Sequence, residues 1–208
     1  MTHFSLEDIN MMEKIFRLNL INSVTGFKSA NLIGTKSSQG ITNVAVFSSI
    51  THLGSNPPYV GFVLRPTTVP RGTYENIKET GLYTINHINT SFTDKAHYTS
   101  AKHIVSEFDA CGLTEEYLDF FHAPYVKESN IKLGMSFQEE IPIKSNGTLL
   151  IVGKVEMLYL PDACIDQDGQ IDLDEAGTAT ISGLNNYHQT QKVGSYPYAR
   201  VGEFPVSV

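Results

Sequence analysis

The sequence contains no tryptophan and only two cysteines, and its basic residues never occur in a run. Cys111 and Cys164 fall in no spacing that is typical of metal or redox motifs, so we interpret both as reduced, partly buried thiols. Against 22 Asp and Glu stand only 15 Lys and Arg, which gives a net charge of −7 at pH 7. Binding to the phosphate backbone of nucleic acid requires a concentrated positive surface. The composition therefore argues against a nucleic-acid-binding function.

Long apolar runs are also absent. No segment approaches the roughly 18 to 20 apolar residues that a membrane-spanning helix needs. The first residues, MTHFSLEDIN, are polar and acidic, whereas a signal peptide begins with positive charge and an apolar stretch. We therefore expect a cytoplasmic protein with no membrane association.

The chain is long enough for one substantial core. It has 208 residues, of which 41% are hydrophobic, and shows no linker, repeat or low-complexity segment. We expect a single domain over residues 1–208, with an N-terminal helical extension over residues 1–23. Ser5 can cap the first helix, and Asp8 completes a capping box with it.

Short strands and tight turns dominate the rest of the chain. A hairpin is predicted where NLIGT, KSSQG and GITNVAVFSS follow one another, and a second where residues 132–143 and 147–160 flank the turn KSNG. A strand over Tyr59–Leu64 lies between prolines, and a short helix ends at Gly81. Residues 93–121 are predicted to be the most helical part, including a stretch around TEEYLDFF. The pattern indicates a mainly β, barrel-like protein with helices at its edges.

One acidic segment resembles a calcium-binding loop. In CIDQDGQIDLDE, Asp166, Asp168, Gly169 and Glu175 fall where an EF-hand loop has its ligands and its glycine. The first position, however, is Cys164, a soft thiol that suits calcium poorly. We therefore expect an acidic hairpin turn around Asp168 and Gly169 instead.

A metal site on the predicted middle helix is weakly indicated. His103 and Glu107 stand four residues apart and could share a helix face, but two ligands are too few for a stable site. No hydrolase or nucleotide-triphosphatase motif is present either. We expect no metal ion.

The start of the helix that ends at Gly81 combines features of an anion site. Arg71 and Thr73 open the helix, and Arg65 ends the strand before it. Free backbone N–H groups and the helix dipole favour a phosphate, and a guanidinium can bind it through two hydrogen bonds. Ordinary turn residues and a helix cap are the alternative interpretation.

Small polar residues also flank the apolar strand over Val44–Phe47. Thr42 and Asn43 precede it, and Ser48 and Ser49 follow it. Their amide and hydroxyl groups could meet the edge of a flat heterocycle, while Val44 and Val46 anchor the strand. Together with the anion site, this pattern could serve a phosphorylated cofactor, beside the alternative of ordinary turn residues and a helix cap.

Four segments resemble one known family in order and spacing. They are GITNVAVFSSITHLGSNPPYVGFVLRP, RGTYENIKETGLYTIN, YTSAKHIVSEFDACGLT and YARVGE. They resemble the flavin reductase-like family of FMN-binding split barrels, over roughly residues 31–203. The resemblance implies a six-stranded antiparallel split β-barrel with flanking helices, usually a homodimer with FMN near the subunit interface.

The resemblance also implies which residues contact the cofactor. The family's Asn-x-Ala-x-Phe-Ser strand, which lies along the flavin ring, matches Asn43, Ala45, Phe47 and Ser48. The family's basic-x-Thr before a short helix matches Arg71 and Thr73, which with Arg65 would hold the phosphate. The implied FMN-binding residues are Thr42, Asn43, Val46, Ser48, Ser49, Arg65, Arg71, Thr73, Ser100 and Ala101.

The implied activity is hydride transfer from NADH or NADPH to FMN. No residue need act as an acid, so no catalytic side chain is assigned, and the protein's part is positioning and electrostatics. The reduced flavin could serve a partner oxygenase or another electron acceptor. Three alternatives stay open: a flavoredoxin-like electron-transfer protein, a pyridoxamine phosphate oxidase-type enzyme, and a β-barrel binding module without flavin.

Overall fold

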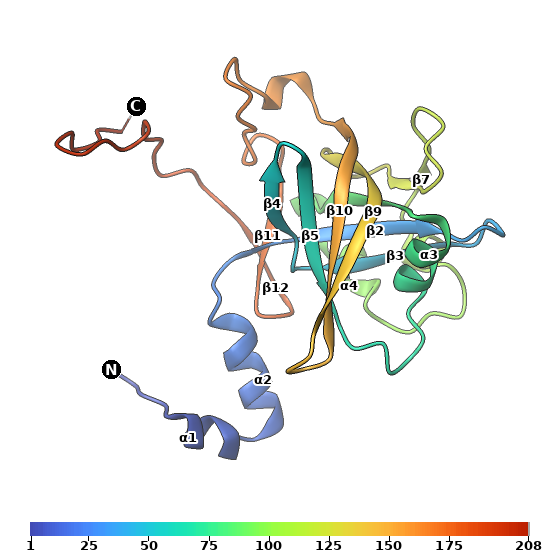
Figure 1. Ribbon diagram of the computed structural model, residues 1–208, viewed down its shortest axis with the longest axis horizontal. Coiled ribbons are helices and arrows are strands. Elements are labelled where there is room, and N and C mark those ends of the chain that lie inside the picture. Colours follow the sequence, from blue (N-terminus) through green and yellow to red (C-terminus); the bar gives the residue numbers. More distant parts are fainter. Residues whose placement is uncertain (208) are drawn as a thin grey trace.

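A seven-stranded antiparallel sheet forms the body of the protein in the computed structural model, which describes residues 1–207 (Figure 1). The strand order is β3-β2-β6-β9-β10-β5-β4, so β3 and β4 are the two edges. The strands are β2 (Asn31–Lys36), β3 (Thr42–Phe47), β4 (Thr51–Ser55), β5 (Pro58–Leu64), β6 (Leu82–His87), β9 (Lys132–Ile143) and β10 (Thr148–Tyr159).

The prediction of six strands is therefore wrong by one strand, and the sheet does not close into a barrel. The unpredicted strand is β4, which pairs with β5 through a register shift between His52 and Gly54. Its sequence THLGS is short, contains a glycine and lies almost entirely exposed. Such a segment lacks the apolar alternation from which strands are recognised. The partner strand, rather than local preference, makes β4 a strand.

Shorter elements surround this sheet. A three-stranded sheet joins β1 (Lys28–Ser29), β11 (Ala179–Ser182) and β12 (Asn186–Gln189), and β7 (Glu115–Glu116) pairs with β8 (Tyr125–Val126). The helices are α1 (Leu6–Met11), α2 (Lys14–Ser23), α3 (Gly72–Thr80), α4 (Thr93–Tyr98) and α5 (Glu107–Cys111), with 3-10 turns η1 (Thr90–Phe92) and η2 (Asp162–Cys164). No helix within residues 1–207 has the length and apolar character to cross a membrane.

Most local predictions are confirmed. Both hairpins form, β2–β3 and β9–β10, in the predicted segments. The capping box of Ser5 and Asp8 starts α1, and Gly81 ends α3 in the left-handed conformation. The helix predicted around TEEYLDFF is wrong, because Glu115 and Glu116 pair with β8 and the chain then turns.

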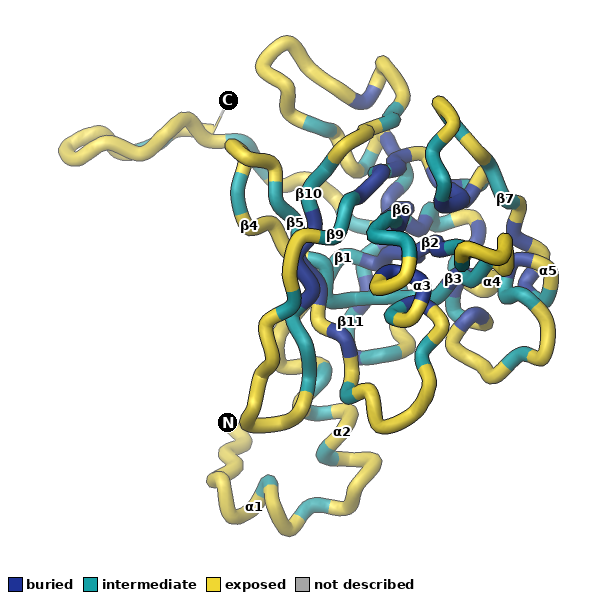
Figure 2. The backbone as a smooth tube through the Cα atoms, turned by 45° about the vertical axis from the view of Figure 1, so that its right-hand side comes forward, coloured by how far each residue is buried: buried dark blue, intermediate teal, exposed yellow. Residues whose placement is uncertain are grey.

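Two apolar clusters lie on opposite faces of the sheet. In Figure 2 the buried residues are concentrated in the body of the molecule, whereas both terminal segments are mostly exposed. Neighbouring residues of β2 point to different clusters, since Leu32 packs with Val44 and Phe108 whereas Ile33 packs with Phe62. This alternation is what a strand buried on both faces requires. β2 is therefore buried on both faces, and its neighbour β3 is held in place by pairing with it.

Gly34 lets the loop before β8 approach the backbone of β2 closely. A Cβ atom at position 34 would meet the carbonyl oxygen of Pro124 and would lie 2.6 Å from the hydroxyl of Thr84. That hydroxyl donates to the Pro124 carbonyl at 2.7 Å. The loop before β8 thus packs directly on backbone, which only glycine at position 34 allows.

Gly34→Ala should lower the free energy of unfolding by about 3 kcal/mol, because a backbone carbonyl cannot move away as a flexible side chain can. The matched control is Gly54→Ala, whose Cβ would lie 3.3 Å from the Pro57 carbonyl oxygen. Urea unfolding followed by circular dichroism measures both. Equal stability of the two variants would contradict this account of the loop.

Candidate functional site

The outer edge of β3 is completed by side chains instead of another strand. The N–H of Val46 donates to the hydroxyl of Thr99 at 3.0 Å, and the N–H of Val44 donates to the Glu107 carboxylate at 3.4 Å. Unpaired backbone groups at a sheet edge otherwise invite pairing with another chain. The edge of β3 is thereby protected, and α4 and α5 are tied to it.

Ser49, in the connection that follows β3, bonds to the backbone of β5. Its hydroxyl donates to the carbonyl of Val63 and accepts from the N–H of the same residue, both at 3.1 Å. This is the pair of bonds that a neighbouring strand residue would make. The side chain of Ser49 therefore continues the pairing of β4 along β5, two residues before the exposed Arg65.

The start of α3 lies beside the start of β3. The amide of Asn43 donates to the buried hydroxyl of Thr73 at 3.0 Å. A Cβ at Gly72 would lie 2.8 Å from the Asn43 side-chain oxygen, so the glycine allows the close approach. The guanidinium Nε of Arg71 donates to the carbonyl of Pro66 at 3.0 Å, which connects Arg71 to the segment after Arg65.

These groups fit a phosphate. Arg71 occupies the N-cap of α3 and no side chain caps the helix there, so the first N–H groups of the helix are open to an anion. Arg65 and Arg71 add two positive charges beside them. The Glu75 carboxylate opposes this only in part, because it already accepts from the N–H of Arg71 at 3.4 Å. The donor set is of the kind that binds a phosphate group.

Thr42 makes its side-chain contacts to acidic and hydroxyl groups. Its hydroxyl donates to Glu115 at 2.6 Å and is 3.1 Å from the hydroxyl of Ser106. An open hollow of about 420 Å³ lies beside it, with Asn43 and Gly72 in its lining together with Glu75, Glu79 and Glu107 but neither lysine nor arginine. The carboxylates make this side of the start of α3 a poor phosphate site.

The remaining predicted residues lie next to Thr99 in the sequence or near the end of β3. Ser100 and Ala101 form the exposed turn after α4, where their N–H groups donate to the carbonyls of His97 and Tyr98. Val46 packs against the core cluster that contains Val44, and Ser48 follows the end of β3 half-buried. Thr42, Asn43 and Val46 thus lie in the edge strand β3, and Ser48 and Ser49 follow it directly.

Comparison with known proteins assigns the family. A model of the flavin reductase-like domain matches residues 27–172. The chain belongs to this family.

Solved structures agree with this membership. A proposed flavin reductase with a split barrel domain from Shewanella frigidimarina is 48% identical, with a TM-score of 0.92 over 95% of this chain and 100% of that one. Nitrilotriacetate monooxygenase component B from Bacillus cereus is 19% identical, with a TM-score of 0.80 over 92% of this chain and 96% of that one. Flavoredoxin of Desulfovibrio vulgaris is 20% identical, with a TM-score of 0.72 over 86% of this chain and 94% of that one. The last two share the fold.

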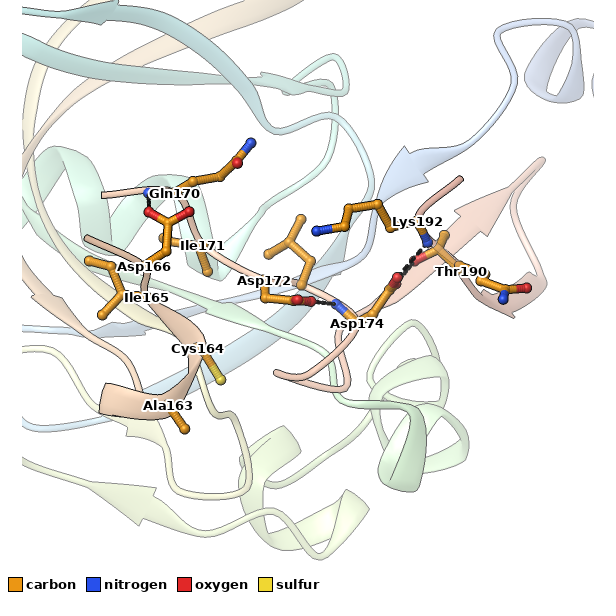
Figure 3. Close-up of a pocket in the computed structure, with 12 residues that line it drawn as sticks. Ala163, Cys164, Ile165, Asp166, Gln170, Ile171, Asp172, Asp174, Thr190 and Lys192 are labelled. Carbon is orange, nitrogen blue, oxygen red and sulfur yellow. Dashed lines mark hydrogen bonds between the residues drawn. The ribbon is translucent and has the colours of Figure 1, made fainter. Parts of the chain in front are cut away.

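A second hollow, of about 470 Å³, is a poor candidate for the flavin of this family (Figure 3). Asp166, Asp172 and Asp174 line it, with Lys192 as the only basic residue of the lining. Their carboxylates accept backbone N–H groups, as Asp166 does from Asp168 and Gln170. The predicted acidic turn is confirmed, with Gly169 at a φ of 83°.

The predicted pairing of His103 and Glu107 on one helix is wrong. α5 begins at Glu107, and His103 lies before it with its Nε2 2.9 Å from the Tyr98 carbonyl oxygen. Within residues 1–207, no three His, Cys, Asp or Glu side chains group as metal ligands would. Burial and the nearby Glu107 raise the pKa of the Cys111 thiol, which makes it a poor nucleophile.

Sequence reasoning missed two residues of this site, Thr99 and Glu107. Each supplies an oxygen to the backbone of β3 from a helix more than fifty positions away. A threonine at a helix end and a glutamate in a first turn carry no local signal for such a role. Only the packing of α4 and α5 on the edge strand reveals it.

Ser49→Ala should lower the free energy of unfolding by about 1 kcal/mol, because the N–H and carbonyl of Val63 both lose their partner. Ser48→Ala is the matched control at the adjacent position and should leave stability unchanged. Urea unfolding compares the two. If both variants unfold at the same urea concentration, the hydrogen bonds of the Ser49 hydroxyl to Val63 do not stabilise the fold.

Proposed function

We propose that this protein binds FMN and transfers hydride from NADH or NADPH to flavin. The observation that carries the proposal is the uncapped start of α3 with Arg65 and Arg71 beside it, at one end of the protected edge strand of a flavin reductase-like fold. A phosphate needs donors and positive charge. A flat ring needs small residues along a rigid strand, as Ser48 and Ala45 supply.

Each part of the site has a separate task. Arg65, Arg71 and the first N–H groups of α3 would hold the phosphate, while β3 and the residues around Ser48 and Ser100 would face the ring. Bound FMN supplies the redox chemistry, since it can accept a hydride from a reduced nicotinamide. The chain itself orients the two ring systems and stabilises negative charge with hydrogen-bond donors.

The proposed setting follows from the same reasoning. A homodimer, with FMN near the subunit interface, is proposed from the family resemblance. The compartment proposed is the cytoplasm, where reduced nicotinamides are present and where Cys111 and Cys164, both free and buried, stay reduced. The electrons would pass to a partner oxygenase or another acceptor, as the likeness to a monooxygenase component B suggests.

Anaerobic addition of NADH or NADPH to the purified protein with FMN should bleach the flavin absorption bands. A flavin that stays oxidised with both nucleotides contradicts reductase activity and favours an electron carrier. Oxidation of pyridoxamine phosphate by oxygen without nicotinamide would indicate the oxidase type. Failure to quench FMN fluorescence would identify a barrel without flavin.

Arg71→Gln should weaken FMN binding about 10- to 100-fold, because a charge-assisted hydrogen bond to the phosphate is lost. Riboflavin, which lacks the phosphate, should bind both proteins within about twofold. Quenching of flavin fluorescence measures all four affinities.

Ser48→Phe is the contrasting variant, because a bulky side chain beside the ring should abolish binding of FMN and riboflavin alike while circular dichroism stays unchanged. Equal weakening of both flavins by Arg71→Gln would show that Arg71 does not bind the phosphate.

A further inference from the structure

Both ends of the chain carry large apolar side chains that are exposed to solvent. In the N-terminal arm, defined as residues 1–24, neither α1 nor α2 has a buried residue. The C-terminal tail, defined as residues 193–207, has no helix and no strand. The large apolar residues exposed in these segments are Met1, Phe4, Leu6, Met11, Ile15, Phe16, Leu18, Ile21 and Val24 in the arm, and Val193, Tyr196, Tyr198, Val201, Phe204 and Val206 in the tail.

Polar contacts fix the base of each segment. The ammonium group of Lys28 donates to the carbonyls of Asn22 and Gly183, at 3.2 and 2.7 Å, and so ties the end of α2 to the turn between β11 and β12. At the other end of the chain, Asp174 accepts from the hydroxyl of Thr190 at 2.8 Å and from the N–H of Lys192 at 2.6 Å (Figure 3). The arm and the tail thus leave the body from fixed points.

The body exposes an apolar sheet face between these points. Leu150 of β10 stands opposite Val63 of β5 and Ile141 of β9, so the three side chains share one face. Val63, Ile141 and the neighbouring Leu53 are each more than a third exposed. Figures 1 and 2 show the arm and the tail extending on the side of β4 and β5. The exposed apolar residues of the arm, the tail and the sheet face thus occur on elements that lie on one side of the molecule.

We propose that a second copy of this chain occupies that space and that the arm and tail of each copy clasp the body of the other. A two-fold arrangement is self-complementary, so each copy offers an apolar sheet face and receives the partner's terminal segments. This goes beyond the homodimer proposed from the family, because it assigns residues 1–24 and 193–207 as the segments that hold the dimer together.

The area and charge of these segments fit a protein partner. The three aromatic side chains of the tail, Tyr196, Tyr198 and Phe204, are 63%, 91% and 94% exposed. Side chains of this size bury about 150 to 250 Å² each, against about 800 Å² per partner in a standard interface. In the arm, Glu7, Asp8 and Glu13 outnumber Lys14 and Arg17, whereas a helix that binds a membrane surface is rich in basic residues.

Sedimentation equilibrium of the full-length protein, without flavin or nucleotide, tests the proposal independently of the enzymatic function. The wild type should be a dimer at micromolar concentration. The tail variant Tyr198→Ser with Phe204→Ser and the arm variant Met11→Gln with Ile15→Gln should each weaken the dimer at least tenfold. The matched control is Phe120→Asn, which removes a fully exposed aromatic from the loop between β7 and β8, at a φ of 60° that asparagine tolerates.

Cross-linking tests the exchange of segments directly. A photoreactive benzoylphenylalanine in place of Tyr198 should give a covalent dimer on a denaturing gel. A monomeric wild type, a dimer that resists both double variants, or cross-links confined to single chains would overturn the proposal. Binding of the wild type to neutral phosphatidylcholine vesicles that is lost in the arm variant would also overturn it, by assigning the arm to a membrane.

Discussion

The site depends on how the backbone hydrogen-bonding groups at the outer edge of β3 find their partners. β3 pairs with β2 on one side only, and its other side faces helices instead of a strand. Thr99 and Glu107 accept hydrogen bonds from the N–H groups of Val46 and Val44, so the edge is protected without being covered by another strand. The hydroxyl of Ser49 bonds instead to Val63 of β5. A strand that is rigid but open at its edge is what a flat cofactor needs as a platform.

Charges of both signs meet at the start of this strand. Arg71 at the uncapped start of α3 is positive, whereas Glu107 and Glu115 make the surroundings of Thr42 negative. An anion bound there would have to lie on the side of the arginines. The chain as a whole carries a net charge of −7. A local positive region of opposite sign is therefore stronger evidence for an anion site than it would be in a basic protein.

Membership of the flavin reductase-like family and this local geometry lead to the same cofactor by separate routes. The family rests on a match over residues 27–172 and on a relative that is 48% identical. The geometry rests on hydrogen bonds and open backbone donors around α3. Both terminal segments lie outside the part that the family model matches, and they carry the exposed apolar residues that a second copy would cover.

The sequence by itself determined the hairpins, the capped start of α1, the glycine end of α3 and the residues able to bind a phosphate. These features depend on neighbours a few positions apart, so local chemistry is sufficient to predict them. The tertiary structure alone decided that THLGS is a strand, that TEEYLDFF is not a helix, and that Thr42 faces carboxylates. It also decided the roles of Ser49, Thr99 and Glu107. Thr42, Ser49, Thr99 and Glu107 each depend on a partner more than ten positions away, and no local pattern encodes such a partner. THLGS and TEEYLDFF pair with nearer segments, but neither carries the apolar alternation from which a strand is recognised.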